Sequence, residues 1–378
     1  MIELREGEIP VVDKRKPYAL VAITKHGVVN ARSYMEKFPY ADLYYMKKFA
    51  KGDEETRHIQ LFDGTVRLLL PALFQQYKGV ICVISLGAVV RMIAPIMVDK
   101  MTDPAVLVVD DLGQYVISVL SGHIGGANEL TYEFANAIGA TPVVTTASDV
   151  QKTIPVDLFG AKFGWMWDSQ EKLLPVSASV VNEEHVAIVQ ETGEKNWWMH
   201  DRAMPDNLNI YPSTTAAIQA KPQATLLITD RIIEAHEEVL LDNGVIYRPK
   251  SIVLGIGCNR GTTVEEIEQV VDETLAELRL SKKSVKAVAT IDLKKDEVGL
   301  LDLTAKHNWS FVTYTPEQLN EMPLLNPSET VFKYTGAYGV SEPAALRYAN
   351  ATEWVLEKKK SGNVTVSIAR VNFEECGQ

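Results

Sequence analysis

Apolar runs that alternate with amphipathic segments dominate the first 150 residues of the chain. Apolar and β-branched content predicts strands over residues 18–24, 41–46, 79–85, 104–110, 114–120 and 141–144. Apolar residues at helical spacing predict helices between them, over residues 27–37, 65–77, 87–97 and 128–139. This alternation favours a mostly parallel sheet that binds its ligands at the carboxyl ends of the strands.

The pattern loosens over residues 151–248, which carry only short apolar runs such as 185–190 and 224–229, and returns afterwards. Strands are predicted there over 251–257, 285–291, 310–315, 353–357 and 363–369, with helices over 263–278, near 296–308 and from Glu342. The predicted fold class is α/β. N-terminal (1–150) and C-terminal (249–378) α/β domains with mostly parallel sheets are joined by a smaller mixed middle domain (151–248).

Composition is that of an ordinary globular protein, with 46% hydrophobic and 23% charged residues among 378. No apolar run approaches the roughly 18 residues of a membrane span. The first residues lack the apolar centre and cleavage site of a signal peptide. We therefore expect a cytoplasmic protein with no membrane partner.

Charge and cysteine usage narrow the chemistry further. The net charge of −11 argues against a general nucleic-acid binder, because phosphate neutralisation needs a basic face, but it allows a small polyanion held by a few local cations. Cys82, Cys258 and Cys376 lie far apart with no CxxC pair, which argues against a disulfide framework and a structural zinc site. No metal ligands are predicted.

The segment SGHIGGANEL (121–130) follows a predicted strand and precedes a predicted helix. Its glycines let a ligand approach the backbone, and amides at the start of a helix favour anions. His123 is suited to act as a general base near neutral pH. The alternative is a tight turn with an incidental histidine. The candidate ligand contacts of this segment are Ser121, Gly122, Gly125, Gly126 and Asn128.

Charged residues nearby could complete a site. Asp110 or Asp111 would orient the His123 ring, and Arg91 and Lys100 would hold a carboxylate. The alternative for Asp111 is that it only shapes its turn, and the alternative for Lys100 is that it is only a solvated charge in a loop. Hydroxyls also follow a strand at Thr145 and Thr146, where binding an anion and capping a helix are both open.

The segment GIGCNRGTT (255–263) is a second strand–glycine loop–helix arrangement. Its candidate contacts are Gly257, Asn259, Arg260, Gly261 and Thr262, and the Arg260 guanidinium suits a carboxylate or phosphate. GxGxxxG is a loose relative of the dinucleotide fingerprint. However, Asp292 lies well beyond the spacing of about 20 residues that a nicotinamide site requires. Cys258 is interpreted as a small buried thiol.

A third glycine turn, TGAYGVSEPAAL (335–346), contains Ser341 as a predicted helix N-cap and Pro343 in the first turn. Ser341 is a further candidate contact. The run Lys358–Lys360, in a predicted hairpin, is the most cationic stretch of the chain.

Four segments together resemble the cobalamin biosynthesis protein CbiG family. They are SLGAVVRMIAP, the block from DK (99–100) through VDDLG and VISVLSGHIGGANELTYEFANAIGATPVVTTASD, then GIGCNRGTTVEEI, and GVSEPAAL. The resemblance covers nearly the whole chain. It implies a cobalt-precorrin-5A hydrolase of anaerobic vitamin B12 synthesis, which opens the ring A δ-lactone and releases the C20 unit as acetaldehyde to leave cobalt-precorrin-5B. It also implies no cofactor, because the tetrapyrrole substrate carries the cobalt.

The resemblance gives the candidate residues specific expected roles. His123 would activate water for attack on the lactone, amides of Gly125 and Gly126 would stabilise the oxyanion, and Asp110 or Asp111 would fix the histidine tautomer. Arg91, Lys100 and Arg260 would bind substrate carboxylates. The alternatives are a non-catalytic tetrapyrrole carrier and a nicotinamide-dependent oxidoreductase. The sequence leaves open a homodimer and handover of product to neighbouring enzymes of the pathway.

Overall fold

The computed structural model describes residues 1–198 and 200–373, so Cys376 lies outside the described residues. The chain forms two compact units, Met1–Leu158 and Phe159–Gln378. Unit 1 contains one sheet of seven strands, and unit 2 contains two sheets of five strands each. The sheets are mostly parallel, which confirms the predicted α/β class.

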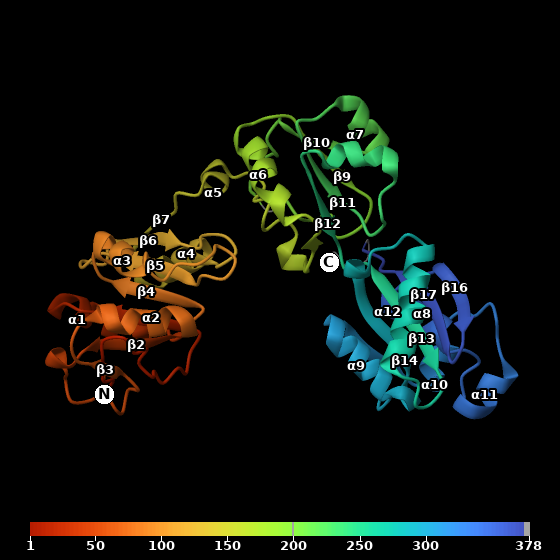
Figure 1. Ribbon diagram of the computed structural model, residues 1–378, viewed down its shortest axis with the longest axis horizontal. Helices are drawn as coiled ribbons and strands as arrows, with labels where there is room; N and C mark the ends of the chain where they lie inside the picture. The colour runs from red at the N-terminus through yellow and green to blue at the C-terminus, as the bar shows by residue number, and fades with distance from the viewer. Residues whose placement is uncertain (199, 374–378) are drawn as a thin grey trace. The chain divides into compact units, whose positions relative to one another are not determined.

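Unit 1 has the strand order β3-β2-β1-β4-β5-β6-β7 (Figure 1). Its strands are β1 (Tyr18–Ala22), β2 (Ala41–Met46), β3 (Gln60–Phe62), β4 (Gly79–Val83), β5 (Ala105–Val109), β6 (Tyr115–Leu120) and β7 (Thr141–Val143). Its α-helices are α1 (Lys25–Lys37), α2 (Val66–Gln76), α3 (Leu86–Ile93), α4 (Ala127–Ile138) and α5 (Ala147–Gln151).

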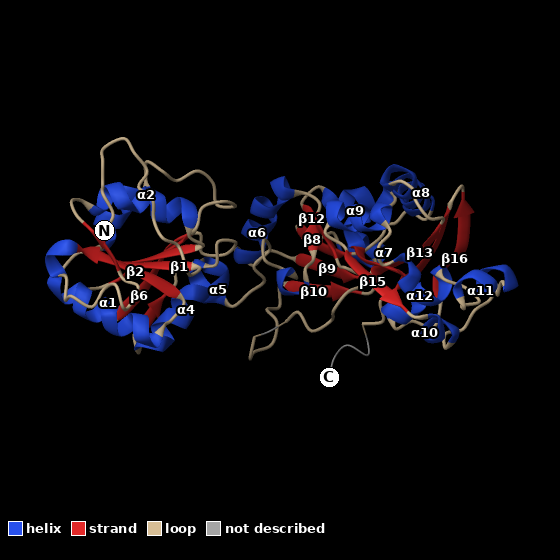
Figure 2. Ribbon diagram, turned by 90° about the horizontal axis from the view of Figure 1, so that it is seen from below, coloured by secondary structure: helices blue, strands red, loops and turns tan. Residues whose placement is uncertain are grey.

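Alternating side chains of the central strands build two cores, one on each face of this sheet. Ala19 and Val21 of β1 pack into the core that α2 and α3 cover, whereas Leu20 and Ala22 pack toward α1 and α4. Figure 2 shows α2 on one side of the sheet and α1 and α4 on the other. Burial on both faces explains why the sequence of these strands is continuously apolar.

The sheet of unit 1 reverses direction between β5 and β6. Strands β1 to β5 run parallel to their neighbours, β5 and β6 form an antiparallel hairpin, and β7 runs parallel to β6. The carboxyl end of β6 therefore lies at the sheet edge opposite to the carboxyl ends of β1, β4 and β5. At roughly 3.4 Å per residue, six residues of β6 separate these edges by about 20 Å.

The first sheet of unit 2 lies within the middle region and has the order β10-β9-β11-β12-β8. It is parallel except for β8. Its elements are β8 (Met166–Trp167), α6 (Leu173–Val181), β9 (Val186–Gln190), β10 (Leu208–Tyr211), α7 (Thr214–Ala220), β11 (Ala224–Ile228) and β12 (Gly244–Arg248). Only β9 and β11 were predicted; β8 and β10 are short, and β12 was missed although all five of its residues are buried.

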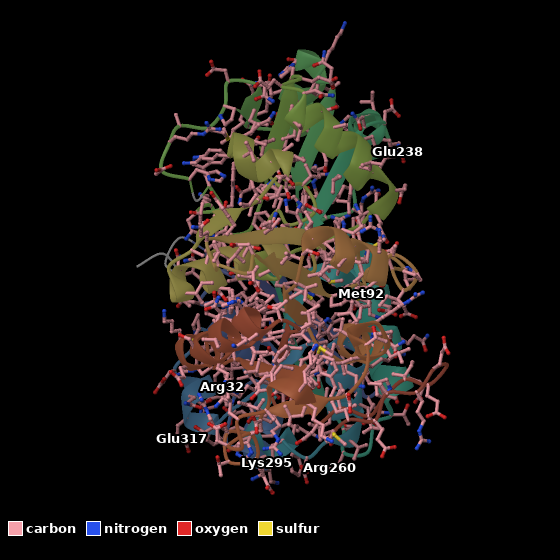
Figure 3. All side chains as sticks on the ribbon, turned by 90° about the vertical axis from the view of Figure 1, so that its left-hand side faces the viewer. Arg32, Met92, Glu238, Arg260, Lys295 and Glu317 are labelled. Atoms are coloured by element: carbon pink, nitrogen blue, oxygen red, sulfur yellow. The ribbon has the colours of Figure 1, made fainter. Side chains whose placement is uncertain are left out.

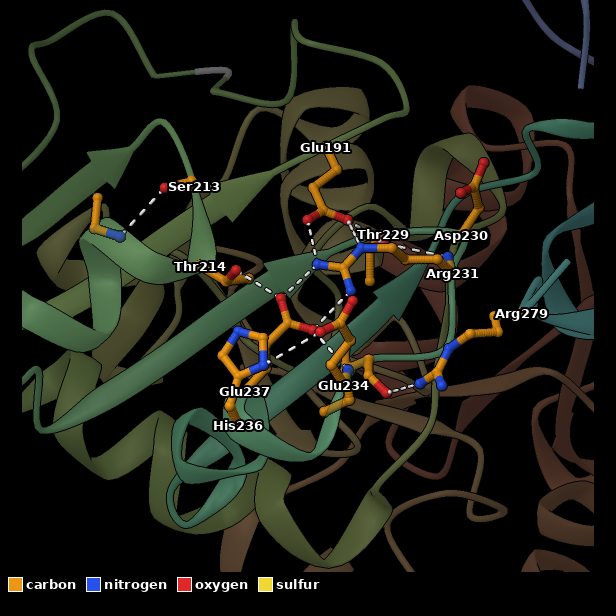
Figure 4. Close-up of polar contacts among 12 residues, drawn as sticks. Glu191, Ser213, Thr214, Thr229, Asp230, Arg231, Glu234, His236, Glu237 and Arg279 are labelled. Carbon is orange, nitrogen blue, oxygen red and sulfur yellow. Dashed lines mark hydrogen bonds and ion pairs between the residues drawn. The ribbon is translucent and has the colours of Figure 1, made fainter.

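A charged network holds together several loops of this middle region (Figure 4). The Arg231 guanidinium lies 2.6 Å from a carboxylate oxygen of Glu191 and 2.6 Å from one of Glu237. Thr214 donates a further hydrogen bond to Glu237. The Glu237 side chain is only 3% exposed, and Arg231 holds the pKa of this carboxyl at about 2. Both carboxylates thus contact the Arg231 guanidinium, so neither is left unpaired.

The second sheet of unit 2 has the order β15-β14-β13-β17-β16, with β17 and β16 antiparallel to their neighbours. Its strands are β13 (Ile252–Cys258), β14 (Val285–Ile291), β15 (Ser310–Tyr314), β16 (Trp354–Ser361) and β17 (Val364–Arg370). Its α-helices are α8 (Val264–Glu277), α9 (Val298–His307), α10 (Pro316–Asn320), α11 (Glu329–Thr335) and α12 (Ser341–Ala349). None of the described helices in either unit has the length and apolarity needed to cross a membrane.

Candidate functional site

The loop from β6 to α4 is tightly closed, and its glycines are needed for that closure. A Cβ on Gly125 would lie 2.3 Å from the Cβ of Ser121, so only glycine fits there. Gly126, with φ of 78°, is the N-cap of α4, and Ser121 also has a positive φ of 58°. A positive φ is strained for a residue with a side chain. The loop therefore holds its conformation through close internal contacts, and this fixes where His123 projects.

His123 lies between two carboxylates that the sequence analysis did not select. Its Nδ1 is 2.9 Å from Oδ1 of Asp157, and its Nε2 is 3.0 Å from Oδ2 of Asp149. The hydroxyl of Ser148 lies 3.1 Å from the same Nε2. Both ring nitrogens are thus engaged, and the side chain is 16% exposed. The imidazole is held in a fixed orientation yet retains contact with solvent.

Asn128 connects this histidine to the end of the sheet. Its side-chain amide donates to Asp149 (2.7 Å) and to the hydroxyl of Thr146 (2.9 Å), and its carbonyl oxygen accepts from Ser118 of β6 (2.7 Å). Because β6 and β7 are parallel, the residues that follow both strands meet at one edge of the sheet. We call the seven residues Ser118, His123, Asn128, Thr146, Ser148, Asp149 and Asp157 the His123 network.

The electrostatics of the His123 network favour the protonated imidazole. Hydrogen bonds to Asp149 and then Asp157 raise the pKa of His123 to about 9, against the opposing effect of burial. The ring is therefore an imidazolium at neutral pH. An imidazolium can donate a proton or stabilise an anion, whereas a general base must be neutral before it reacts. The expected role of His123 as the initial base does not fit this state.

The expected partners Asp110 and Asp111 are corrected by the structure. Asp110 accepts hydrogen bonds from the amides of Leu112 and Tyr115, and Asp111 accepts one from the hydroxyl of Thr24. Both aspartates lie at the β5–β6 turn, at the start of β6, whereas His123 follows its end. The predicted turn of only three residues between two strands already indicated an antiparallel hairpin, and hence this separation.

The other predicted contacts of unit 1 are the cations Arg91 and Lys100 and the hydroxyls of Thr145 and Thr146. The carbonyl of Asp103 packs beside Gly125, so the loop that carries exposed Lys100 lies at the same sheet edge. Arg91 is exposed on α3, where it donates to the carbonyl of Gly87. Thr145 is exposed, and Thr146 occupies an N-cap position without capping through its side chain.

One of the two backbone amides that were expected to bind the oxyanion, that of Gly126, is already hydrogen-bonded within the loop. The amide of Gly126 donates to the carbonyl of His123 at 2.8 Å, so it is already occupied. Gly122 leaves room for Asn128, whose side-chain oxygen would lie 2.8 Å from an added Cβ. The hydroxyl of Ser121 is buried and has no hydrogen-bond partner among the described residues. A buried hydroxyl without a partner is costly, so Ser121 adds to the strain of this loop.

Sequence reasoning missed Ser148, Asp149 and Asp157. The motif TTASD (145–149) was selected for its threonines, although its aspartate is the residue that reaches His123. Asp157 follows the helix α5 in an irregular segment, where no periodic pattern marks it. Only the tertiary fold brings it to Nδ1.

A second candidate site is a cavity of about 320 Å³ in unit 2. Of the predicted residues, Gly257, Asn259 and Ser341 line it, together with Cys258 and the three lysines Lys294, Lys358 and Lys360. Ser341 is the first residue of α12 rather than its N-cap, since Val340 occupies the cap position; its hydroxyl instead lies 2.9 Å from that of Ser367. Burial raises the pKa of the Cys258 thiol, so it stays protonated.

The remaining predicted residues of the GIGCNRGTT loop do not line this cavity. Arg260 (labelled in Figure 3) is 59% exposed, pairs with Asp296 at 2.8 Å and donates to the carbonyl of Leu293. The amide of Gly261 donates to Glu297, and the hydroxyl of Thr262 donates to the carbonyl of Asn259. Gly261 and Thr262 thus stabilise the loop, and the charge of Arg260 is already matched.

The described residues contain no group of three or more histidine, cysteine, aspartate or glutamate side chains arranged to hold a metal ion. In the His123 network, Asp149 and Asp157 bond opposite ring nitrogens, so their oxygens do not converge on one point with an imidazole nitrogen.

Comparison with known proteins identifies the family. Three family models match in chain order: Cobalamin synthesis G N-terminal (69–149), Cobalamin biosynthesis central region (154–249) and Cobalamin synthesis G C-terminus (252–369). The chain is 60% identical to a cobalt-precorrin-5A hydrolase of Priestia megaterium, covering 99% of this chain and all of that protein. It therefore belongs to the cobalamin biosynthesis protein G (CbiG) family, as its sequence motifs predicted.

Two further relatives are more distant. A cobalt-precorrin-5A hydrolase of Salmonella typhimurium is 31% identical over 88% of this chain and 92% of that protein. The protein CobE of a Sinorhizobium species is 33% identical over 122 residues, which cover 31% of this chain and 79% of CobE.

Proposed function

We infer that this chain is a cobalt-precorrin-5A hydrolase. The observation that carries this function is the 60% identity to the Priestia megaterium enzyme over 99% of the chain. The substrate class is a cobalt-containing tetrapyrrole rich in carboxylates. The reaction that the family implies is opening of the ring A δ-lactone, followed by release of the C20 unit as acetaldehyde to give cobalt-precorrin-5B.

For the lactone opening we propose the His123 network as the acid–base centre. Water adds to the lactone carbonyl and transfers a proton to the Asp149 carboxylate. The acyl carbon–oxygen bond breaks, and the His123 imidazolium protonates the departing oxygen, which becomes the C20 hydroxyl. The proton then passes from Asp149 to Nε2 of His123 across their 3.0 Å contact, which restores the starting state. Water is consumed, and one carboxyl and one hydroxyl group are formed.

The surroundings of His123 support this assignment in three ways. Asp157 holds Nδ1, so that the ring presents Nε2 toward Asp149 and Ser148. The raised pKa keeps the acid protonated at neutral pH. The exposed ammonium of Lys100 is available at the same sheet edge for polar groups of the substrate.

The test is incubation of the purified chain with cobalt-precorrin-5A under anaerobic conditions, with acetaldehyde assayed and the tetrapyrrole followed by mass spectrometry. We expect acetaldehyde together with the matching loss of mass. Recovery of the tetrapyrrole at unchanged mass would contradict a hydrolase and match a carrier that only binds.

We propose that the reaction needs no resident cofactor, because cobalt arrives within the substrate, and that the enzyme acts in the cytoplasm. The free thiols of Cys82 and Cys258 fit a reducing compartment. A homodimer and direct handover of product to neighbouring enzymes remain proposals, which size-exclusion chromatography and pull-down with those enzymes would test.

A further inference from the structure

Two lysines face the cavity of unit 2 without an acidic partner. Lys358 and Lys360 lie on β16 and line the cavity, and neither forms an ion pair within the described residues. Lys359, between them, pairs with Glu277 of α8 at 2.7 Å. Successive side chains of a strand point to opposite faces. This explains why Lys359 reaches Glu277 while Lys358 and Lys360 line the cavity. Lys358 and Lys360 thus bring two unmatched ammonium groups to one cavity of a chain whose net charge is −11.

The two glycines of the GIG segment differ in what requires them. A Cβ on Gly255 would lie 1.8 Å from the backbone oxygen of Ser341, so Gly255 is needed for α12 to pack against β13. A Cβ on Gly257 would meet nothing closer than 3.9 Å. Packing does not require glycine at position 257, and a side chain there would extend into the cavity. Gly257 therefore keeps the cavity open.

Part of the cavity lining is apolar. Ile291 of β14, Val331 and Tyr334 of α11, and Val340 line it, and Tyr334 is 77% exposed. A lining that combines apolar and cationic side chains suits a flat, apolar ring system that carries carboxylates at its edge. The volume of about 320 Å³ is at the lower limit of small-molecule sites, so it suits one edge of a macrocycle.

We propose that this cavity binds the carboxylate-bearing edge of the tetrapyrrole, with Lys358 and Lys360 contacting carboxylates and Tyr334 and Val340 contacting the ring. The proposal rests on the inferred hydrolase function, whose substrate is of this chemical class. It adds a binding role in unit 2 to the proposed function.

The test uses a stable probe, cobyrinic acid, which is a corrinoid with free peripheral carboxylates. Its binding to the full chain is measured by absorbance titration. The double variant Lys358→Gln/Lys360→Gln should bind it about tenfold or more weakly, because two charge-assisted contacts are lost. The matched control is Lys359→Gln, on the same strand but the opposite face, and it should bind as the wild type does. Cobinamide, whose peripheral carboxylates are amides, should bind the wild type weakly.

A second variant tests the cavity without changing its charge. Gly257→Leu should fill the cavity and weaken binding of cobyrinic acid at least tenfold, with an unchanged circular dichroism spectrum, since no close contact opposes the new side chain. Wild-type affinity in both the double lysine variant and Gly257→Leu would overturn the proposal. That result is distinguishable from failure of the hydrolase function, which would appear as no acetaldehyde from the wild-type chain.

Discussion

The two glycine loops of this protein look alike in sequence and differ in almost everything that surrounds them. Each follows a buried strand and leads into a helix. In the SGHIGGAN loop, the glycines close the turn on itself, and one imidazolium is neutralised by two carboxylates. In the GIGCNRG loop, Gly257 leaves a cavity open, and two lysines beside it have no acidic partner among the described residues. A matched charge network suits proton transfer, whereas unmatched cations suit binding of an anion.

The largest expected effect is on the proton transfer that we assign to the His123 network. His123→Asn should lower the rate of acetaldehyde release by about 10²–10⁴, because the proton donor is lost. Its affinity for cobyrinic acid should stay within about threefold of the wild type, since we assign binding to the cavity of unit 2. Asp111→Asn, at the other edge of the sheet, is the matched control and should retain wild-type turnover. Full acetaldehyde release by His123→Asn would remove this histidine from the mechanism.

The charged cluster of Arg231, Glu191 and Glu237, the Arg231 network, provides a reference for both loops because we assign it no role in function. Arg231→Leu should lower the free energy of unfolding by about 3–5 kcal/mol, because Glu237 is left buried and unpaired. Acetaldehyde release per folded molecule should be unchanged, which would mark the Arg231 network as purely structural. Chemical denaturation measures the first quantity, and Arg260→Leu is the control, expected to cost less than about 1 kcal/mol because that pair is exposed. A loss of turnover in folded Arg231→Leu would contradict this assignment.

The matched charges of the His123 network also predict a pH dependence of stability. Folding raises the pKa of His123 from 6.5 to about 9, so the pairing contributes its full stability below pH 6.5 and loses it as the pH rises through 9. After allowance for solvent screening, the contribution is about 1–3 kcal/mol. Denaturation of the wild type and of His123→Asn at pH 6.5 and 9.5 measures it. The difference between them should shrink at the higher pH; an equal difference at both values would show that the histidine is neutral in the folded chain.

The smallest expected effect concerns Arg260, which the sequence had suggested for carboxylate binding. Arg260→Gln should change affinity for cobyrinic acid less than about threefold, because Asp296 already neutralises the guanidinium and the side chain does not line the cavity. The comparison with Lys358→Gln/Lys360→Gln shows whether matched and unmatched cations of one unit differ in function. A tenfold loss of affinity for cobyrinic acid in Arg260→Gln would show that its carboxylates bind outside the cavity.

Much of the fold was predictable because its strands are buried on both faces. The strand 41–46 and the strand 285–291 have the predicted bounds, and α4 and α8 differ from prediction by one residue at each end. Helix α3 ends at Ile93, although its apolar pattern continues to Met97. Prediction was poorest in the middle region, where β10 has only four residues and the five-residue β12 was missed although it is fully buried.

The candidate site was predicted in part. His123, Asn128 and Thr146 lie in one hydrogen-bonded network, and Gly257, Asn259 and Ser341 line one cavity. The partners of His123 were assigned to aspartates near it in sequence, whereas the reversal of strand direction at β6 brings Asp149 and Asp157 to it instead.

The sequence by itself determined the α/β class, the family and the position of both glycine loops, because hydrophobic periodicity and local motifs are properties of contiguous residues. The tertiary structure alone decided which charges meet. Strand direction and register set which side chains share an edge or a face, and so they matched His123 with two carboxylates and left Lys358 and Lys360 facing a cavity without any.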